Sequence, residues 1–167
     1  MKNKITFGGK PVTLVGTEIK VGVKAPNFTA LKNDLTTCSL DELKGKVVVI
    51  SVMPSVDTSV CELQTIRFNK EASEAKDIAV ITISADLPFA LGKFCANKGI
   101  ESAITLSDHK DLDFGTKYGF VLKELRLLSR GIVVIDKEGI VQYVEYVQEI
   151  TNQPNYDAAI AVAKKLV

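Results

Sequence analysis

Cysteine is the residue type in this 167-residue sequence with the clearest capacity for chemistry, and it occurs as Cys38, Cys61 and Cys95. A cysteine thiolate is a nucleophile and a redox centre, although a free cysteine is often only a small buried hydrophobic residue. The single histidine, His109, lies in a polar segment, and with three scattered cysteines it gives no metal-ligand spacing. Glycine-rich phosphate-binding loops are absent as well. The sequence therefore predicts thiol chemistry with neither a metal nor an organic cofactor.

Cys61 is the strongest candidate because it falls at the start of a predicted helix. The segment Ser59-Val60-Cys61-Glu62 has the S-x-x-E form of a capping box, which predicts Ser59 as the N-cap and Glu62 at the third helical position. Cys61 would then occupy the second helical position, beside unpaired backbone N–H groups and the positive end of the helix dipole. These surroundings favour the thiolate over the thiol.

Thr58 and Pro54 precede Cys61 in a turn that predicts a small pocket. Thr58 is close enough to the cysteine to offer a hydroxyl, and Pro54 sets the incoming loop and shields one side from water. Such a pocket suits the O–O bond of a peroxide better than a carbonyl group with a bulky acyl chain. A Cys–His hydrolase is disfavoured because no histidine lies near Cys61, and a thioredoxin-type disulfide reductase because no C-x-x-C is present.

Hydrophobic patterning predicts alternating strands and helices around these residues. The β-branched run Val47–Val52 is typical of a strand covered on both faces, and Pro54 ends it. Asp86 is the expected N-cap of the helix that contains Cys95, with Pro88 in its first turn. In chain order we expect a hairpin of Ile5–Phe7 and Pro11–Val15 about Gly8-Gly9-Lys10, a strand at Phe28–Leu31, a capping box at Ser39–Glu42, the strand at Val47–Val52, the helix from Ser59, a strand at Ile78–Ser84, the helix from Asp86 to Gly99, a strand at Ala103–Leu106, a short helix from Ser107 or Asp108 to Gly119, a hairpin of Gly131–Ile135 and Ile140–Val147, and a helix at Tyr156–Leu166 capped by Asn155.

The order of these elements predicts an α/β fold. A strand–helix–strand unit implies a right-handed parallel crossover, and the closing hairpin adds antiparallel strands. The sheet should therefore be mixed, with helices on both faces. This is the order of a thioredoxin-like core with an N-terminal β-hairpin extension, residues 1–17, and a mid-chain strand–helix insert. We expect a single domain over residues 1–167.

Composition narrows the partners and the compartment. The formal net charge is +1, so the chain has no general attraction for nucleic acid or anionic lipid. No apolar run is long enough for a signal peptide or a membrane span. Three cysteines are too few for a secreted disulfide scaffold, and the odd number leaves one thiol over. The sequence thus favours a cytoplasmic protein that binds neither nucleic acid nor membranes.

The segment from Pro54 to Cys61 reads P-x-x-x-T-x-x-C and resembles the active-site motif of the peroxiredoxins. Over nearly all its length the chain is similar to their bacterial thiol peroxidase subfamily, which are atypical two-cysteine peroxiredoxins. The motif alone is moderately specific, whereas the set of matching blocks is strong. Those further blocks are Gln64-Thr65, Phe68-Asn69, Ser84 to Ala90, Phe94-Cys95, Ile104 to Asp108 and Leu127 to Arg130.

The resemblance implies a role for each residue of the site. Cys61 would be the peroxidatic cysteine, which attacks hydrogen peroxide or an organic hydroperoxide and becomes a sulfenic acid. Arg130 would hold the thiolate and polarise the peroxide, Thr58 would hydrogen-bond the reacting atoms, and Pro54 would shield them. Cys95 would be the resolving cysteine and form an intrachain disulfide with Cys61, which thioredoxin would reduce. The resemblance also implies a homodimer.

Without the resemblance, several alternatives stay open. Cys95 lies near the end of an apolar helix, where a core residue is the commoner interpretation. Arg130 is not distinguished from Arg67 or Arg126, and Cys38 is interpreted as a spectator. A non-catalytic thioredoxin-fold redox sensor or interaction module is the alternative to an enzyme.

The two-cysteine scheme carries a geometric expectation. Cys61 and Cys95 fall on separate helices, and a disulfide needs Cα atoms within about 7 Å. We therefore expect the two sulfurs to lie too far apart in the reduced protein, and local unwinding to accompany turnover.

Overall fold

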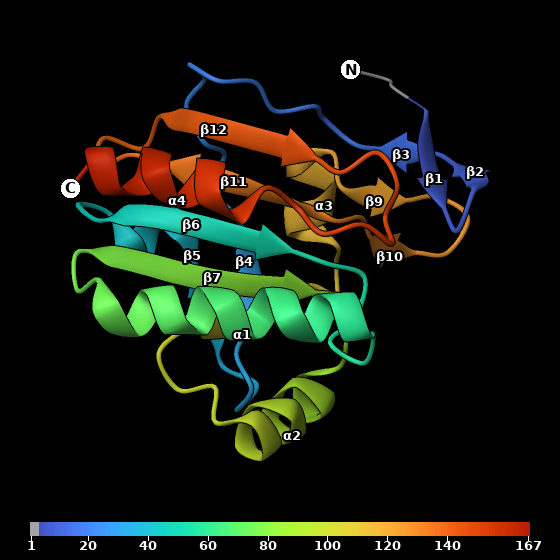
Figure 1. Ribbon diagram of the computed structural model, residues 1–167, viewed down its shortest axis with the longest axis horizontal. Helices are drawn as coiled ribbons and strands as arrows, with labels where there is room; N and C mark the ends of the chain where they lie inside the picture. The colour runs from blue at the N-terminus through green and yellow to red at the C-terminus, as the bar shows by residue number, and fades with distance from the viewer. Residues whose placement is uncertain (1–3) are drawn as a thin grey trace.

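The computed structural model describes residues 4–167, and for Ala72 and Ser73 the backbone alone (Figure 1). Strands and helices alternate through the middle of the chain, as the sequence predicts. In chain order the elements are β1 Ile5–Phe7, β2 Lys10–Val12, β3 Leu14–Val15, β4 Thr29–Leu31, β5 Thr37–Ser39, a 3₁₀ turn at Leu40–Leu43, β6 Val47–Val52, α1 Ser59–Glu74, β7 Ile78–Ser84, α2 Pro88–Lys98, β8 Ile104–Ser107, α3 Asp113–Tyr118, β9 Val121–Leu122, β10 Leu127–Leu128, β11 Gly131–Ile135, β12 Val141–Tyr146 and α4 Tyr156–Lys165.

The central sheet has seven strands in the order β12-β11-β6-β7-β8-β4-β5. Strands β6, β7 and β8 are parallel neighbours, whereas β11 runs antiparallel to β6 with Gly131 opposite Val52. The carboxyl ends of β6, β7 and β8 and the start of β11 therefore lie at one edge of the sheet. That edge brings together the loop after β6, the connection from β7 to α2, and the residue before β11, which is Arg130.

Both faces of the sheet are covered, as expected for strands that are almost continuously apolar. Helices α1 and α4 pack on one face, and α3 and the segment before β4 pack on the other (Figure 1). The predicted fold class, a thioredoxin-like mixed sheet flanked by helices, is confirmed. The buried side chains between this face of the sheet and the two helices are Val47, Val49, Phe68, Val80, Ile132, Val134, Ala159, Ile160 and Ala163.

The predicted N-terminal hairpin forms, but it is shorter than expected. Strands β1 and β2 pair around Gly8 and Gly9, whose φ angles are 60° and 81°, so the turn needs glycine at both positions. The second strand ends at Val12, and β3 pairs with β9 in a separate small sheet. Strands β5, β9 and β10 have only two or three residues and carry no pattern that predicts them.

The predicted start of α2 is wrong by one residue. Its N-cap is Leu87, with extended φ and ψ of −66° and 148°, because the Asp86 side chain bonds to other segments. Pro88 does occupy the first turn, and the helix ends as predicted at Gly99, where φ is 66°. The α4 cap at Asn155 is confirmed, since its Oδ1 accepts from the Ala158 N–H at 3.1 Å.

The short helix α3 begins later than predicted, at Asp113 rather than at Ser107 or Asp108. Asp108 nevertheless satisfies its first turn from outside the helix. Its carboxylate accepts from the Phe114 N–H at 3.0 Å and from the Gly115 N–H at 2.8 Å. Asp108 therefore does cap the helix with its side chain, but the residues between Asp108 and Asp113 form a turn rather than helix.

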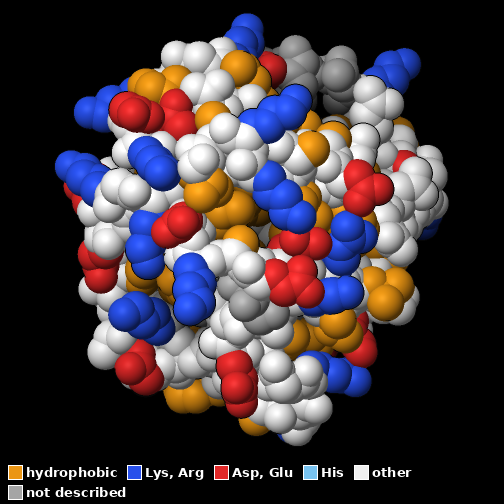
Figure 2. All heavy atoms as spheres, turned by 60° about the vertical axis from the view of Figure 1, so that its left-hand side comes forward, with side chains coloured by type: hydrophobic (Ala, Val, Ile, Leu, Met, Phe, Trp, Pro, Cys, Tyr) orange, Lys and Arg blue, Asp and Glu red, His pale blue; other side chains and the backbone are white. Residues whose placement is uncertain are grey.

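Acidic and basic side chains are interspersed over the face seen in Figure 2, in keeping with the small net charge. No helix within residues 4–167 is long and apolar enough to cross a membrane.

Candidate active site

The start of α1 differs from the predicted capping box. Thr58, not Ser59, is the N-cap: its backbone is extended and its Oγ1 accepts from the Cys61 N–H at 3.3 Å. The Thr58 hydroxyl also donates to the Ser55 carbonyl at 3.3 Å, a contact that Ser59 does not have. Cys61 consequently lies at the third helical position, still within the first turn and its unpaired N–H groups.

Cys61 is completely buried, with 0% of its surface exposed. It belongs to a hydrophobic cluster between the end of β6 and α2, and half-buried Cys95 borders the same cluster. Both thiols are free, so the predicted disulfide and the predicted unwinding stay predictions. The other buried members of the cluster are Met53, Val56, Leu91, Phe94 and Ile100.

Arg130 is almost fully buried, with 2% of its surface exposed, and hydrogen bonds hold its guanidinium in place. Its Nε donates to the Ile150 carbonyl at 2.6 Å, and its Nη1 donates to Gln64 Oε1 at 2.8 Å. A buried guanidinium keeps its charge in such surroundings because its donors have partners. The arginine to which the resemblance assigns a role is thus held at the edge of the sheet, next to the first turns of α1.

Gln64 is a functional candidate for which sequence reasoning gave no role. It is fully buried on α1, three residues after Cys61 and therefore on the same side of the helix. Its Nε2 donates to Ser51 Oγ at 2.7 Å and to the Val52 carbonyl at 3.2 Å, which directs its Oε1 to Arg130. The signal that could have found it is a polar side chain on the buried side of an amphipathic helix.

Tyr156 on α4 is half-buried, and nearby charges act on the pKa of its hydroxyl. Burial raises the pKa of its hydroxyl, the charges of Arg130 and Arg67 lower it, and the charge of Cys61 raises it. Among the described residues, the buried Tyr156 Oη has no hydrogen-bond partner. Arg130 is placed near Cys61 by its hydrogen bond to Gln64, which lies one turn after Cys61 on α1.

Pro54 and Thr58 flank the loop that leads into α1. Pro54 is buried directly after β6, whereas Thr58 is exposed at the helix start. The structure thus places Pro54, Thr58, Cys61 and Arg130 at one edge of the sheet, and their roles in catalysis stay predictions.

Cys95 has different surroundings. Its Sγ lies 3.4 Å from Thr105 Oγ1 and 3.8 Å from Asn33 Nδ2, and the Thr105 hydroxyl donates to Asn33 Oδ1 at 2.9 Å. The side chain lines a surface cavity of about 350 Å³. The cavity is otherwise lined by Lys32, Asn33, Asp34, Ile100, Glu101, Ala103, Ile104 and Thr105.

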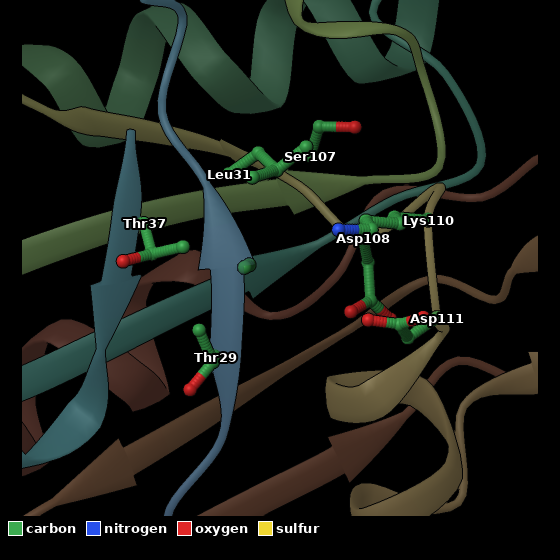
Figure 3. A pocket seen from close by; sticks show the side chains of 8 residues that line it. Thr29, Leu31, Thr37, Ser107, Asp108, Lys110 and Asp111 are labelled. Atoms are coloured by element: carbon green, nitrogen blue, oxygen red, sulfur yellow. The ribbon is translucent and has the colours of Figure 1, made fainter. Parts of the chain in front are cut away.

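The remaining titratable candidates lie elsewhere. Cys38 is buried on β5, and burial raises the pKa of its thiol, which makes it a poor nucleophile. Asp108 borders a cavity of about 60 Å³ (Figure 3), and burial raises its pKa to about 6. Within residues 4–167, no group of three or more histidine, cysteine, aspartate or glutamate side chains could hold a metal ion.

Comparisons with known proteins show which family the chain belongs to. A family model described as Redoxin matches residues 20–160. The thiol peroxidase of Bacillus subtilis is 56% identical, with 98% of each chain covered, and that of Listeria innocua is 56% identical over 97% of this chain and 98% of the relative. A solved peroxiredoxin-like protein from Aquifex aeolicus has a TM-score of 0.92 at 39% identity, covering 98% of this chain and 96% of the other.

The chain belongs to the redoxin family. Within that family it is a thiol peroxidase of the peroxiredoxin type, and therefore a peroxidase enzyme.

Proposed function

We propose that this enzyme reduces hydrogen peroxide and organic hydroperoxides to water and alcohols through Cys61. The Cys61 thiolate attacks the terminal peroxide oxygen and the O–O bond breaks. Sulfur is oxidised to a sulfenic acid, and the departing alkoxide or hydroxide takes up a proton. Arg130 stabilises the negative charge as it moves from sulfur to the leaving oxygen, Thr58 hydrogen-bonds the reacting atoms, and Pro54 excludes water.

Cys95 then completes the cycle. Its sulfur attacks the Cys61 sulfenic acid, an S–S bond forms within the chain, and water leaves. A dithiol reductant of the thioredoxin type gives two electrons to this disulfide, restores both thiols and becomes a disulfide itself. Cys38 takes no part.

The observation that carries the proposal is the fixed guanidinium of Arg130 beside the helix start that bears Cys61. Two hydrogen bonds aim this permanent charge before any substrate arrives, which is the condition for electrostatic stabilisation of a transition state. Because Cys61 has no exposed surface, small side-chain movements must admit the peroxide.

Two further parts of the proposal rest on family membership and composition. The enzyme acts as a homodimer, as the resemblance implies. It works in the cytoplasm, where reducing conditions keep structural disulfides rare and a thiol enzyme can be recycled.

The test is peroxide consumption coupled to thioredoxin and its reductase, with Cys61→Ser, Cys95→Ser and Cys38→Ser run side by side. We expect Cys61→Ser to abolish consumption and Cys95→Ser to stop after about one peroxide per chain, with a trapped sulfenic acid. Cys38→Ser is the matched control, a buried cysteine that should keep full turnover.

Full activity of Cys61→Ser would refute the assignment of the nucleophile. Consumption of only about one peroxide per unsubstituted chain, with the reductant present, would favour a redox sensor over an enzyme.

A further inference from the structure

Asp86 reaches out of the connection between β7 and α2 to hold the loop after β6. Its Oδ1 accepts from the Ser55 hydroxyl at 2.7 Å, and its Oδ2 accepts from the Val56 N–H at 2.9 Å and from the Ser84 hydroxyl at 2.7 Å. Hydrogen bonds to an ionised carboxylate are stronger than those between neutral groups. One side chain therefore fixes a loop that is 30 residues away in sequence.

From Ser55 the hydrogen bonds continue to the nucleophile. The Ser55 carbonyl accepts from the Thr58 N–H at 3.4 Å and from the Thr58 hydroxyl at 3.3 Å. Thr58 Oγ1 in turn accepts from the Cys61 N–H at 3.3 Å. A continuous path thus runs from the Asp86 carboxylate through two residues to the backbone of Cys61.

The backbone of Asp86 is itself anchored. Its carbonyl accepts from the Ser107 hydroxyl at the end of β8, and its N–H donates to Ser84 Oγ at 3.2 Å. Helix α2, which carries Cys95, begins two residues later at Pro88. Asp86 therefore lies at a fixed point between the loop that shapes the Cys61 site and the helix that carries Cys95.

We propose that Asp86 is a positioning residue for the oxidation of Cys61. By holding Ser55 and Val56, it keeps the Thr58 hydroxyl and the first turn of α1 in the geometry that peroxide attack requires. A misplacement of about 1 Å in such a constellation costs on the order of 100-fold in rate. Because the anchor lies before α2, the loop would stay in place if α2 unwound. The inference rests on the proposed function.

The experiment measures sulfenic acid formation at Cys61 in single turnover, in a Cys95→Ser background, by quenching with a dione trapping reagent and mass spectrometry. We expect Asp86→Ala to lower the second-order rate constant with hydrogen peroxide about 100-fold. Asp86→Asn should restore part of the loss, to about 10-fold below the parent, because an amide oxygen still accepts from the Val56 N–H.

Asp108→Ala is the matched control, since Asp108 also accepts from two backbone N–H groups, but on α3. It should lower the melting temperature and leave the rate constant within about twofold. If Asp86→Ala does not fold, Ser55→Ala decides the matter, with an expected fall of about 5-fold from the loss of one bond to the carboxylate.

An unchanged rate constant in folded Asp86→Ala, or in Ser55→Ala where the former does not fold, would overturn the inference and leave the proposed function intact. An equal fall in Asp108→Ala would also overturn it. A parent chain that forms no sulfenic acid at Cys61 would instead refute the proposed function.

Discussion

Cys61 and Cys95 contact one hydrophobic cluster, but they differ in burial and in the hydrogen bonds around them. Cys61 is fully buried in the first turn of α1, and hydrogen bonds fix its N-cap and the neighbouring Arg130. Cys95 is half-buried near the end of α2, has two long contacts to Asn33 and Thr105, and faces a cavity of about 350 Å³.

This difference matches the demands of the two proposed chemical steps. Peroxide attack gains most from charges and dipoles that are fixed in advance, so rigidity is useful around Cys61. Disulfide formation requires the two sulfur atoms to approach to about 2 Å. Few strong contacts to the side chain of Cys95 therefore favour this step. Cys95 is partly exposed and borders a cavity, which gives its side chain room to move.

The largest effect on the rate of Cys61 oxidation should come from disturbing the fixed surroundings of this residue. Lysine at position 130 keeps the positive charge but cannot donate to both the Ile150 carbonyl and Gln64 Oε1 with the geometry of a guanidinium. We expect Arg130→Lys to slow Cys61 oxidation by about 100- to 1,000-fold, measured as single-turnover sulfenic acid formation.

Arg126→Lys is the control for this substitution, because the exposed Arg126 donates to the His109 carbonyl, outside both cysteine regions. It should leave the rate constant unchanged. Equal rates for the two variants would mean that a mobile positive charge is sufficient at the site, and that rigidity does not distinguish Cys61.

A smaller effect should follow from removing a contact of Cys95. Asn33→Ala removes the amide next to the Cys95 sulfur and leaves α2 with one contact fewer in the reduced form. Since that contact must break before the disulfide forms, we expect disulfide formation to accelerate about threefold while Cys61 oxidation stays unchanged. Quenched samples analysed by mass spectrometry separate the two steps.

Asn27→Ala is the matched control, since Asn27 Oδ1 accepts from the Asp41 N–H, away from either cysteine. If Asn33→Ala slows disulfide formation instead, the Asn33 amide assists the reaction of Cys95. The contact between the two side chains would then not be a restraint that must break.

The surroundings of Cys61 are also more predictable from the sequence than those of Cys95, but only for features that depend on neighbouring residues. The run Val47–Val52 and the cysteine at a helix start follow from patterns of neighbouring residues, and the structure confirms both. Thr58 and Ser59 are both good capping residues, and a contact from Thr58 to Ser55 settles the choice.

Long-range contacts explain what sequence reasoning could not find. The partner of Arg130 on α1 is 66 residues away, so no local pattern separates this arginine from Arg67 or Arg126. Asp86 was assigned to the nearest helix start, whereas its carboxylate bonds to a loop 30 residues earlier. Tertiary packing, rather than propensity, decides such positions.

The smallest effect on either cysteine should come from Asp108, which lies outside both regions and points toward Asp111 (Figure 3). Burial raises its pKa to about 6 in the folded protein, and the charges of Asp111 and Asp113 add to the shift. A carboxyl with a raised folded-state pKa stabilises the fold below its unfolded pKa and loses that contribution as pH rises through about 6. Asp108→Asn has no such titration.

We therefore expect the free energy of unfolding of the parent, relative to Asp108→Asn, to fall by about 2 kcal/mol between pH 4 and pH 7. Urea denaturation of both chains at several pH values measures this difference. Cys61 oxidation and disulfide formation at pH 7 should be equal in the two proteins, because the Asp108 carboxylate bonds to α3 and touches neither cysteine region. A parallel pH dependence of the two stabilities would contradict the raised pKa, and a changed oxidation rate would show that the Asp108 carboxylate also acts on the site of Cys61.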